Sequence, residues 1–290
     1  MALKEKRQHS SELVPFSYYK CLIPDFFSCV PLHWHGEFEI NYILEGSAEF
    51  LCGEERFTSE KGDIIIIPPN MLHAIYTREN CVQRYDTIVF SADMLGASAN
   101  DRCTAELIQP LVNNHSGINM HITVNHPYYN EIKTTAENIF SCAKGNSCQL
   151  DMLLKSELLR LFWLLENNGD IYRKSDSNSD FIGAIRPAVE YINDNYCENI
   201  TVQQLADIVH LSKSYFMSRF RQAAGVGAIE YITQLRIKKA CARLLSDSNM
   251  NTADIAFECG FRNLSNFNRQ FRKAVGCTPC EYKKINSPRS

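Results

Sequence analysis

The sequence lacks long hydrophobic runs: no segment of its 290 residues approaches 18 consecutive apolar positions. Because a membrane-spanning helix needs about 20 such residues, we expect no contact with a membrane. Residues 1–10 also lack the apolar centre of a secretory signal peptide. We therefore expect a cytoplasmic protein whose 12 cysteines are free thiols in a reducing compartment.

A second Cys-x-x-Cys pair is also missing. Cys277 and Cys280 form one such motif, whereas cysteine-only zinc sites combine two. The motif follows a predicted helix instead of opening one after a strand, which argues against a thioredoxin-like redox site. We expect no metal or redox role for these two cysteines.

Positive charge is scarce in the N-terminal half and concentrated in the C-terminal part. Residues 181–290 contain 15 Lys and Arg against 9 Asp and Glu, a net charge of +6. Residues 1–180 contain 15 against 24, a net charge of −9. The chain is long enough for two domains. A basic C-terminal domain favours a polyanionic partner such as DNA, and the acidic half argues against DNA contacts there.

A block near the C-terminus occurs twice, about 50 residues apart. Each copy has two phenylalanines four residues apart and then Arg, Ala, Gly and Glu-Tyr: Phe216, Phe220, Arg221, Ala223, Gly225, Glu230 and Tyr231 in the first, and Phe267, Phe271, Arg272, Ala274, Gly276, Glu281 and Tyr282 in the second. Such self-similarity indicates two copies of one small helical unit in tandem.

Each copy predicts two helices joined by a short turn. The first unit spans about 200–225 and begins at Thr201, a capping residue, and the second spans about 251–276 and begins at Asn251. The segment 229–245 between them has no Gly or Pro and keeps helical spacing. A helix of about 17 residues is roughly 25 Å long. It would hold the two units apart by a distance near the one-turn repeat of DNA, roughly 34 Å.

The second helix of each unit has an outward face of short polar and basic side chains. The residues expected to contact DNA are Lys213, Ser214, Met217, Ser218 and Arg221 in the first unit, and Asn263, Ser265, Asn268, Arg269, Arg272 and Lys273 in the second. Such groups pair with base edges and phosphates, and the arrangement matches helix-turn-helix docking in a major groove. The alternative is a small helical core with a solvated face. Because the polar face recurs in both copies, DNA binding is favoured.

The last 100 residues or so resemble the signature of AraC/XylS-type transcription regulators. The residues that carry the resemblance are Leu205-Ala206, Ser214-Tyr215-Phe216, Phe220-Arg221, Gly225, Glu230-Tyr231, Arg236-Ile237, Ala240, Leu244-Leu245, Ile255-Ala256, Gly260-Phe261, Phe267, Arg269, Phe271-Arg272-Lys273, Gly276, Thr278-Pro279 and Tyr282. One departure is Gly227-Ala228, where the family often has Ser/Thr-Pro. The resemblance implies a DNA-binding regulator that acts through RNA polymerase.

The N-terminal half has the pattern of short strands followed by two helices. Apolar or alternating runs at 39–44, 48–52, 64–67 and 87–90 are separated by turn residues, which predicts a β-barrel or jelly roll. Helices are expected at about 127–143 and 149–167. The fold class is therefore α+β multidomain. We assign 1–168 to a cupin-like effector-binding and dimerisation domain, 169–182 to a flexible linker, and 183–290 to a DNA-binding domain with two helix-turn-helix units.

A polar constellation lies within the predicted strands. His33, His35 and Glu39, with the later His73, resemble the two cupin motifs and occupy all four metal-ligand positions. Such a site would suit a divalent Fe, Mn, Ni or Zn ion. The same residues, with Tyr42, would equally line a pocket for a sugar-like effector, and the sequence leaves both uses open.

The second predicted helix of this half carries a broad apolar stripe. The expected dimer contacts are Leu154, Leu158, Leu161, Phe162 and Leu165. The alternative is that the stripe packs against its own barrel. The sequence does not discriminate between the two.

These observations predict a homodimeric transcription regulator, with activation expected, that binds double-stranded DNA, responds to a small molecule such as a carbohydrate, and is not an enzyme. One alternative is a cupin metalloenzyme tethered to DNA. Another is a ligand-independent DNA-binding protein whose N-terminal half only dimerises. The effector, the operator and the sign of regulation are not encoded in any recognisable motif.

Overall fold

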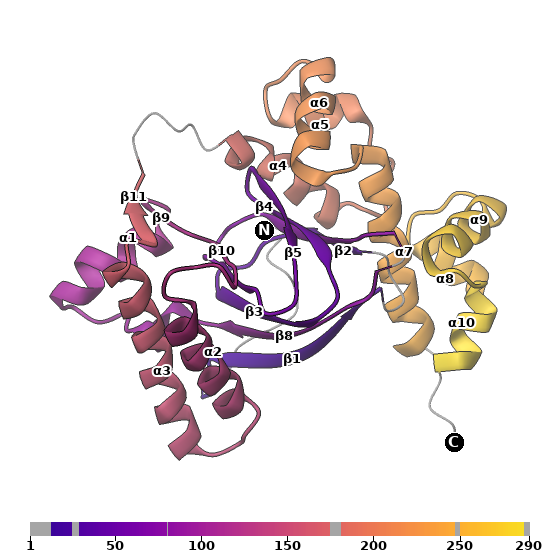
Figure 1. Ribbon diagram of the computed structural model, residues 1–290. Coiled ribbons are helices and arrows are strands. Elements are labelled where there is room, and N and C mark those ends of the chain that lie inside the picture. The colour runs from indigo at the N-terminus through magenta and orange to yellow at the C-terminus, as the bar shows by residue number, and fades with distance from the viewer. Residues whose placement is uncertain (1–12, 25–28, 80, 175–180, 247–249, 287–290) are drawn as a thin grey trace.

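Strands and helices occupy separate parts of the chain in the computed structural model, which describes residues 13–24, 29–79, 81–174, 181–246 and 250–286 (Figure 1). The strands belong almost entirely to the first 122 residues, and seven helices, α4 to α10, follow from residue 181 onward in the described chain. The predicted α+β multidomain class is confirmed.

Two antiparallel sheets form the N-terminal β-domain. The larger has the order β1 (Phe16–Ile23), β8 (Gln83–Phe90), β3 (Phe38–Glu45), β6 (Ile64–Ile67) and β10 (His121–Ile122). The smaller has the order β2 (Cys29–His33), β7 (His73–Thr77), β4 (Ala48–Cys52) and β5 (Glu55–Ser59). Non-consecutive neighbours in both sheets are typical of the jelly-roll connectivity that the strand pattern predicts.

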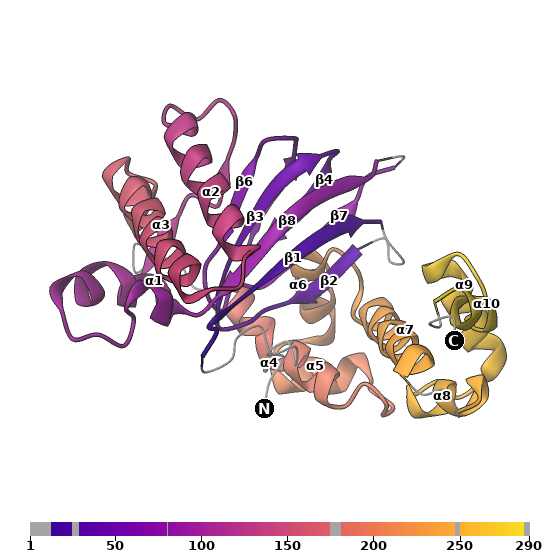
Figure 2. The same cartoon turned by 90° about the horizontal axis from the view of Figure 1, so that it is seen from below.

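Short helices and two long ones follow the sheets. The short elements are η1 (Ala92–Leu95), the π-helical η2 (Thr104–Ile108) and α1 (Gln109–Val112). The long helices α2 (Tyr129–Ala143) and α3 (Cys148–Asn167) cover the outer face of the larger sheet (Figure 2). Phe162 of α3 packs edge-on against Phe38 of β3, with ring centroids 5.0 Å apart. This packing buries the apolar stripe of α3 inside the β-domain.

The proposed dimer contacts on α3 are therefore corrected. Leu154, Leu158, Leu161, Phe162 and Leu165 are each at most 1% exposed and belong to the core of the β-domain. Side chains buried within one copy cannot contact a second copy. The apolar face exists as its periodicity predicts, but the β-domain itself covers that face.

The predicted linker 169–182 is ordered at its beginning. β11 (Ile171–Arg173) pairs antiparallel with β9 (Ser116–Ile118), with Ile171 opposite Ile118. The polar Ser/Asp-rich composition concealed this pairing, because three ladder positions are too few for a strand pattern. Residues 175–180 of the predicted linker lie outside the described residues, and α4 (Phe181–Asp194) begins directly after them.

The remaining helices form two similar units around a long central helix. The first unit contains α5 (Val202–Ile208) and α6 (Lys213–Ala224), and the second contains α8 (Thr252–Glu258) and α9 (Leu264–Val275). The central helix α7 (Ala228–Ser246) connects them, and α10 (Pro279–Asn286) ends the described chain. Among the described residues, no helix has both the length and the apolarity needed to cross a bilayer.

Three hydrophobic cores organise these elements. The first lies inside the β-domain and under α2 and α3. The second joins the outer face of the smaller sheet to α4, the first helical unit and the beginning of α7. The third contains the end of α7 together with the second unit and α10. Figures 1 and 2 accordingly show the first unit against the strands and the second unit farther out.

Candidate functional site

The first recognition helix, α6, begins and ends at residues that favour helix termini. The Ser212 hydroxyl caps it by accepting a hydrogen bond from the amide of Tyr215, and Gly225 ends it in the left-handed conformation at φ 69°. Phe216 and Phe220 are completely buried, one turn apart. The opposite face of α6 is thereby directed to solvent.

The second recognition helix, α9, repeats this construction. Asn263 caps it by accepting a hydrogen bond from the amide of Asn266 at 2.8 Å, and Gly276 ends it at φ 83°. Phe267 and Phe271 are buried. Asn263 was expected to contact DNA, and the structure shows that its side-chain oxygen caps α9.

All of the residues expected to contact DNA are exposed. They are Lys213, Ser214, Met217, Ser218 and Arg221 on α6, and Asn263, Ser265, Asn268, Arg269, Arg272 and Lys273 on or before α9. Tyr215 was not predicted from the sequence. It is 45% exposed on α6 and accepts a hydrogen bond from Nη2 of Arg219 at 2.7 Å. Because Tyr215 directly precedes the inward-facing Phe216, its exposure on α6 could have been predicted from the helical spacing.

The four residues of the cupin-like motifs come together inside the β-domain. His33 ends β2, His73 begins β7 directly opposite it, and Glu39 lies on β3 of the other sheet. With His35, each residue offers one ligand atom, and these four atoms lie within 4.8 Å of one another. His35, Glu39 and His73 are buried, and His33 is half-buried. We call these four residues the histidine cluster.

Backbone carbonyls orient the three imidazoles. Nδ1 of His33 lies 2.9 Å from the carbonyl oxygen of Pro31, and Nδ1 of His73 lies 2.9 Å from that of Met71. Nδ1 of His35 lies 3.1 Å from the carbonyl oxygen of Glu37. Since a carbonyl oxygen only accepts hydrogen bonds, each Nδ1 carries a hydrogen. Each neutral imidazole therefore has its lone pair on Nε2.

Glu39 is the anionic member of the histidine cluster. Its Oε2 lies 3.1 Å from Nε2 of His35 and 3.6 Å from Nε2 of His73. Burial opposes ionisation of this carboxyl, but the hydrogen bonds and positive charge that His35 and His73 supply when both of their ring nitrogens carry hydrogen outweigh it, so the pKa of Glu39 falls well below its ordinary value. The carboxylate is therefore ionised in a buried place.

A hydrogen-bond chain supports Glu39 from behind. Asn41 Nδ2 donates to Glu39 Oε1 at 2.8 Å, and the Thr87 hydroxyl donates to Asn41 Oδ1 at 2.6 Å. Neither supporting residue was predicted from the sequence. Asn41 stands two positions after Glu39 and so shares its face of the strand, which is the signal that could have found it.

Tyr42 does not belong to this site, and its assignment to the effector pocket is corrected. Its hydroxyl donates to Glu137 Oε1 at 3.3 Å, and its ring stacks on Phe140 of α2 at 6.2 Å. Successive strand residues point to opposite faces of a sheet. With Glu39 facing the interior of the β-domain, Tyr42 faces α2.

A hollow of about 610 Å³ lies elsewhere on the β-domain, between the η2 region and β11. Arg102, Glu106, Glu166 and Arg173 are among its lining residues, and it does not include the histidine cluster. Its lining carries both signs of charge. Such a lining differs from the mostly apolar walls that are typical of small-molecule sites.

The outer face of the smaller sheet packs against α4, the first helical unit and the beginning of α7. Leu32, Trp34, Leu72 and Ala74 are buried in the second core together with Phe216 and other residues of the first unit. These four alternate along the chain with His33, His35 and His73. One side of β2 and β7 therefore carries the histidines, and the other side carries the contact with the first unit.

Polar contacts reinforce this junction. The Tyr231 hydroxyl of α7 donates to the carbonyl oxygen of Leu32 at 2.8 Å. The Tyr76 hydroxyl of β7 donates to the carbonyl oxygen of Ala224 at the end of α6. Arg186 of α4 lies over the Trp34 ring at 4.3 Å and also donates to the carbonyl oxygen of Asn70. The junction was not expected from the sequence.

Together, these surfaces define a DNA-binding regulator with a separate ligand-binding domain. Residues 27–162 match a family described as an AraC-like ligand binding domain, and residues 205–285 match one described as a helix-turn-helix domain. The chain belongs to the AraC/XylS-type transcription regulators and is a regulator, not an enzyme.

Its curated relatives span nearly the same length. The chain is 24% identical to the uncharacterized HTH-type transcriptional regulator YdeC of Bacillus subtilis, over 98% of this chain and 97% of that protein. It is 25% identical to the melibiose operon regulatory protein of Escherichia coli K12, over 100% of this chain and 96% of the relative. It is 27% identical to the raffinose operon transcriptional regulatory protein RafR of Pediococcus pentosaceus, over 84% of each chain.

Among solved structures, ToxT from Vibrio cholerae is similar to this chain with a TM-score of 0.47. The sequence identity is 14%, and the match covers 93% of this chain and 98% of ToxT.

Proposed function

We propose that this protein is a cytoplasmic, homodimeric transcription activator whose β-domain binds a small carbohydrate and whose first helix-turn-helix unit receives the signal. One observation carries the proposal. The strands that hold the histidine cluster on their inner face hold the first unit on their outer face, through Leu32, Trp34, Leu72 and Ala74. A ligand that moves these strands also moves the surface on which the first unit rests.

The carbohydrate assignment rests on two supports. Two relatives that align over most of the chain are named as regulators of a melibiose operon and a raffinose operon. The histidine cluster also offers hydrogen-bond acceptors next to buried apolar side chains, and the hydroxyl groups of a sugar can donate to them. The proposed effector residues are accordingly His33, His35, Glu39 and His73.

DNA binding by both units has a direct electrostatic test. Arg221 of α6 and Arg272 of α9 follow the buried phenylalanines at equivalent positions and are both exposed. If each arginine pairs with a phosphate, Arg221→Ala or Arg272→Ala should make the negative slope of log K for DNA binding against log salt shallower by about 1, on any DNA sequence. An unchanged slope in both variants would show that these charges only face solvent.

The homodimer proposal moves from the buried stripe of α3 to its exposed face. Met152, Leu159 and Trp163 are 70%, 43% and 58% exposed, and their spacing places them along one side of the helix. Trp163→Glu should therefore yield a folded monomer in light scattering. If the wild-type protein is already monomeric at micromolar concentration and on its operator, this surface has no such role.

The effector proposal is tested with melibiose and raffinose as probes. In the wild-type protein, one of them should raise the melting temperature and change operator binding and transcription by RNA polymerase in vitro. His35→Ala should still bind DNA but lose this response. His121→Ala is the matched control, because His121 is a half-buried histidine that pairs with Asp63 at 2.7 Å, outside the histidine cluster.

Two results would redirect the proposal. If a wider panel of metabolites leaves stability and DNA binding unchanged, the protein is a ligand-independent regulator whose β-domain serves assembly. If His35→Ala keeps a full response to the sugar, the effector binds elsewhere in the β-domain.

A further inference from the structure

The histidine cluster has the composition of a metal site. Three imidazole nitrogens and one carboxylate oxygen converge within 4.8 Å of one another. A first-row ion that binds nitrogen and oxygen at about 2.0–2.2 Å requires its ligand atoms to lie roughly 3–4.4 Å apart. Small side-chain rotations bring the four atoms into this range. Oxygen and nitrogen ligands of this kind suit divalent zinc, iron, manganese or nickel.

The hydrogen bonds around the histidines prepare them for this role. The carbonyl oxygens of Pro31, Glu37 and Met71 each hold one Nδ1 as a donor. In metal sites, such a bond from the second ring nitrogen fixes the tautomer and directs the other nitrogen to the ion. Glu39 is likewise held from behind by the amide of Asn41. All three imidazoles and the carboxylate are therefore oriented by neighbouring groups.

The facing atoms also require a positive charge between them. When Nδ1 of His35 carries the proton, Nε2 of His35 and Oε2 of Glu39 are two acceptors only 3.1 Å apart. Two facing lone pairs at this distance repel each other unless a proton or a metal ion lies between them. A third acceptor, Nε2 of His73, lies 3.6 Å from the same oxygen. One divalent ion can satisfy all of these lone pairs at once.

We propose that His33, His35, Glu39 and His73 bind one divalent transition-metal ion. This ion stabilises β2 and β7, the strands whose outer face carries the first helix-turn-helix unit. His33 and His73 face each other across β2 and β7, whereas Glu39 comes from β3 in the opposite sheet. An ion held by all four links the two sheets directly behind Leu32 and Leu72. Loss of the ion loosens β2 and β7 and the packing of these strands against the first unit.

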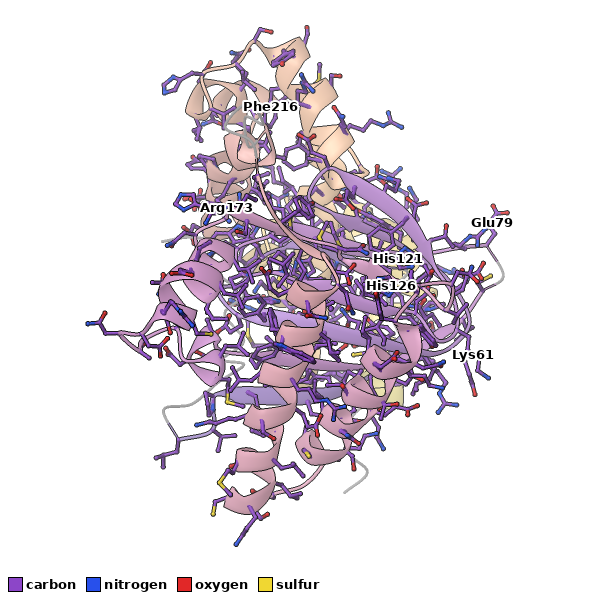
Figure 3. The ribbon with its side chains drawn as sticks, turned by 60° about the vertical axis from the view of Figure 1, so that its left-hand side comes forward. Lys61, Glu79, His121, His126, Arg173 and Phe216 are labelled. Atoms are coloured by element: carbon purple, nitrogen blue, oxygen red, sulfur yellow. The ribbon has the colours of Figure 1, made fainter. Side chains whose placement is uncertain are left out.

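Two other histidines of the β-domain have a different arrangement. His121 pairs with Asp63, and His126 pairs with Asp170 at 3.1 Å, so each of these pairs combines a single imidazole with a single carboxylate. Figure 3 shows these two histidines near each other on the β-domain, with Phe216 of the first unit at the far end of the view. They serve as internal controls for the histidine cluster.

The test is a metal titration of the full-length protein, purified without a histidine tag and stripped with a chelator. Manganese and nickel ions are the probes, because thiolates favour zinc and the chain has 12 cysteines. The wild type should bind one ion per chain. Glu39→Gln and His35→Ala should bind it at least 100-fold more weakly, and His121→Ala should bind it as the wild type does.

Hydrogen exchange provides a second readout, which reports on the stability of β2 and β7. Adding the ion should slow hydrogen exchange in peptides that contain Leu32 and Leu72 in the wild type and in His121→Ala, but not in Glu39→Gln. This measurement uses the wild-type protein as its main sample, so a poorly folded variant does not decide the outcome.

The proposal is overturned if neither ion binds the wild type stoichiometrically, or if Glu39→Gln binds as tightly as the wild type. It is also overturned if the bound ion leaves exchange at Leu32 and Leu72 unchanged. These outcomes are separate from the proposed function. If the protein responds to a sugar but binds no ion, only the metal-site proposal fails. If it binds the ion but does not respond to sugars, only the carbohydrate assignment fails.

Discussion

The two helix-turn-helix units share their helices and their buried phenylalanines but not their surroundings. Phe216 and Phe220 of the first unit lie in a core that includes Leu32 and Leu72 of the β-domain. Phe267 and Phe271 of the second unit lie in a core whose described members all belong to the C-terminal part, from Ile237 onward. The same fold therefore shares a hydrophobic core with the ligand-binding domain in one copy, whereas the core of the other copy includes no described residue of that domain.

This difference teaches that duplication copies a fold without copying its connections. Helix α7 belongs to both cores: Tyr231, Ile232 and Leu235 pack with the first unit, and Ile237 and Leu244 pack with the second. A disturbance of the β-domain reaches the first unit directly. It reaches the second through α7 and through the loop at Cys197, which lies against Gly260 of the second unit. Matched substitutions at equivalent positions can therefore separate the sensing role of one unit from the DNA-binding role that both share.

The largest effect is expected from the buried phenylalanines. Phe216→Ala and Phe267→Ala should each lower the free energy of unfolding by about 3–5 kcal/mol, since both side chains are fully buried. Chemical denaturation measures this decrease. Only Phe216→Ala should also speed hydrogen exchange in β2 and β7, because only Phe216 packs in the core shared with those strands. Equal exchange in the two variants would contradict the comparison.

The glycines at the ends of the recognition helices sharpen the comparison further. Gly225 and Gly276 both have positive φ, so an alanine costs about 1–2 kcal/mol at either position. A Cβ on Gly225 would also lie 3.0 Å from the Tyr76 hydroxyl, whereas no described atom outside the immediate chain neighbours lies within 4 Å of one on Gly276. Gly225→Ala should therefore be more destabilising by roughly 1 kcal/mol or more.

Thermal and chemical denaturation of the two glycine variants, side by side, measure this difference. If Gly276→Ala is the more destabilising of the two single variants, the first unit does not pack against β7 in solution.

The DNA-reading residues should favour the second unit. Arg269 occupies the exposed face of α9, and the repeat places Ser218 at the equivalent position of α6. Arg269→Ala should weaken specific operator binding by about 1–3 kcal/mol and relax the preference at one base pair. Ser218→Ala should change it by no more than about 0.5 kcal/mol. Competition with random DNA distinguishes base reading from phosphate binding, because removing a phosphate partner weakens both complexes equally.

The smallest effect is expected at the tyrosines that follow each recognition helix. Tyr231→Phe removes the hydrogen bond to the carbonyl oxygen of Leu32 and should cost about 0.5–1.5 kcal/mol. The equivalent Tyr282 packs on Phe271 in the second core. Tyr282→Phe should therefore leave hydrogen exchange at Leu32 unchanged, whereas Tyr231→Phe should speed it. Faster exchange at Leu32 in Tyr282→Phe but not in Tyr231→Phe would contradict the assignment of the junction to the first unit.

Local signals explain how much of the fold could be predicted. The caps at Thr201 and Asn251 and the glycines at 225 and 276 mark helix ends through bonds to near neighbours in the chain, and the structure places the helices there. Strands β3, β4, β6 and the end of β8 were predicted for the same reason, since an apolar or alternating run is visible in a single segment. The three-residue strand β11 was missed because its partner is distant in sequence.

The candidate site was predictable only in part. The spacing of His33, His35, Glu39 and His73 brought the right four residues together, but Tyr42 was wrong because an odd number of positions separates it from Glu39 along one strand. The stripe of α3 was wrong because periodicity identifies an apolar face and not its partner. The junction at Leu32 and Leu72 was missed, because the alternation of apolar residues with histidines in these segments indicates two faces but does not identify the helices that cover the apolar face.

The length of α7 has an evolutionary consequence. Its 19 residues form a helix of about 28 Å, and a single inserted residue would rotate the second unit by about 100° relative to the first. An insertion of seven residues, about two turns, restores the direction to within roughly 20° while adding some 10 Å. The spacing between the two DNA segments that the units bind therefore cannot change gradually, one residue of α7 at a time. Lineages with this architecture can change that spacing only in jumps of whole turns, with protein and promoter changing together.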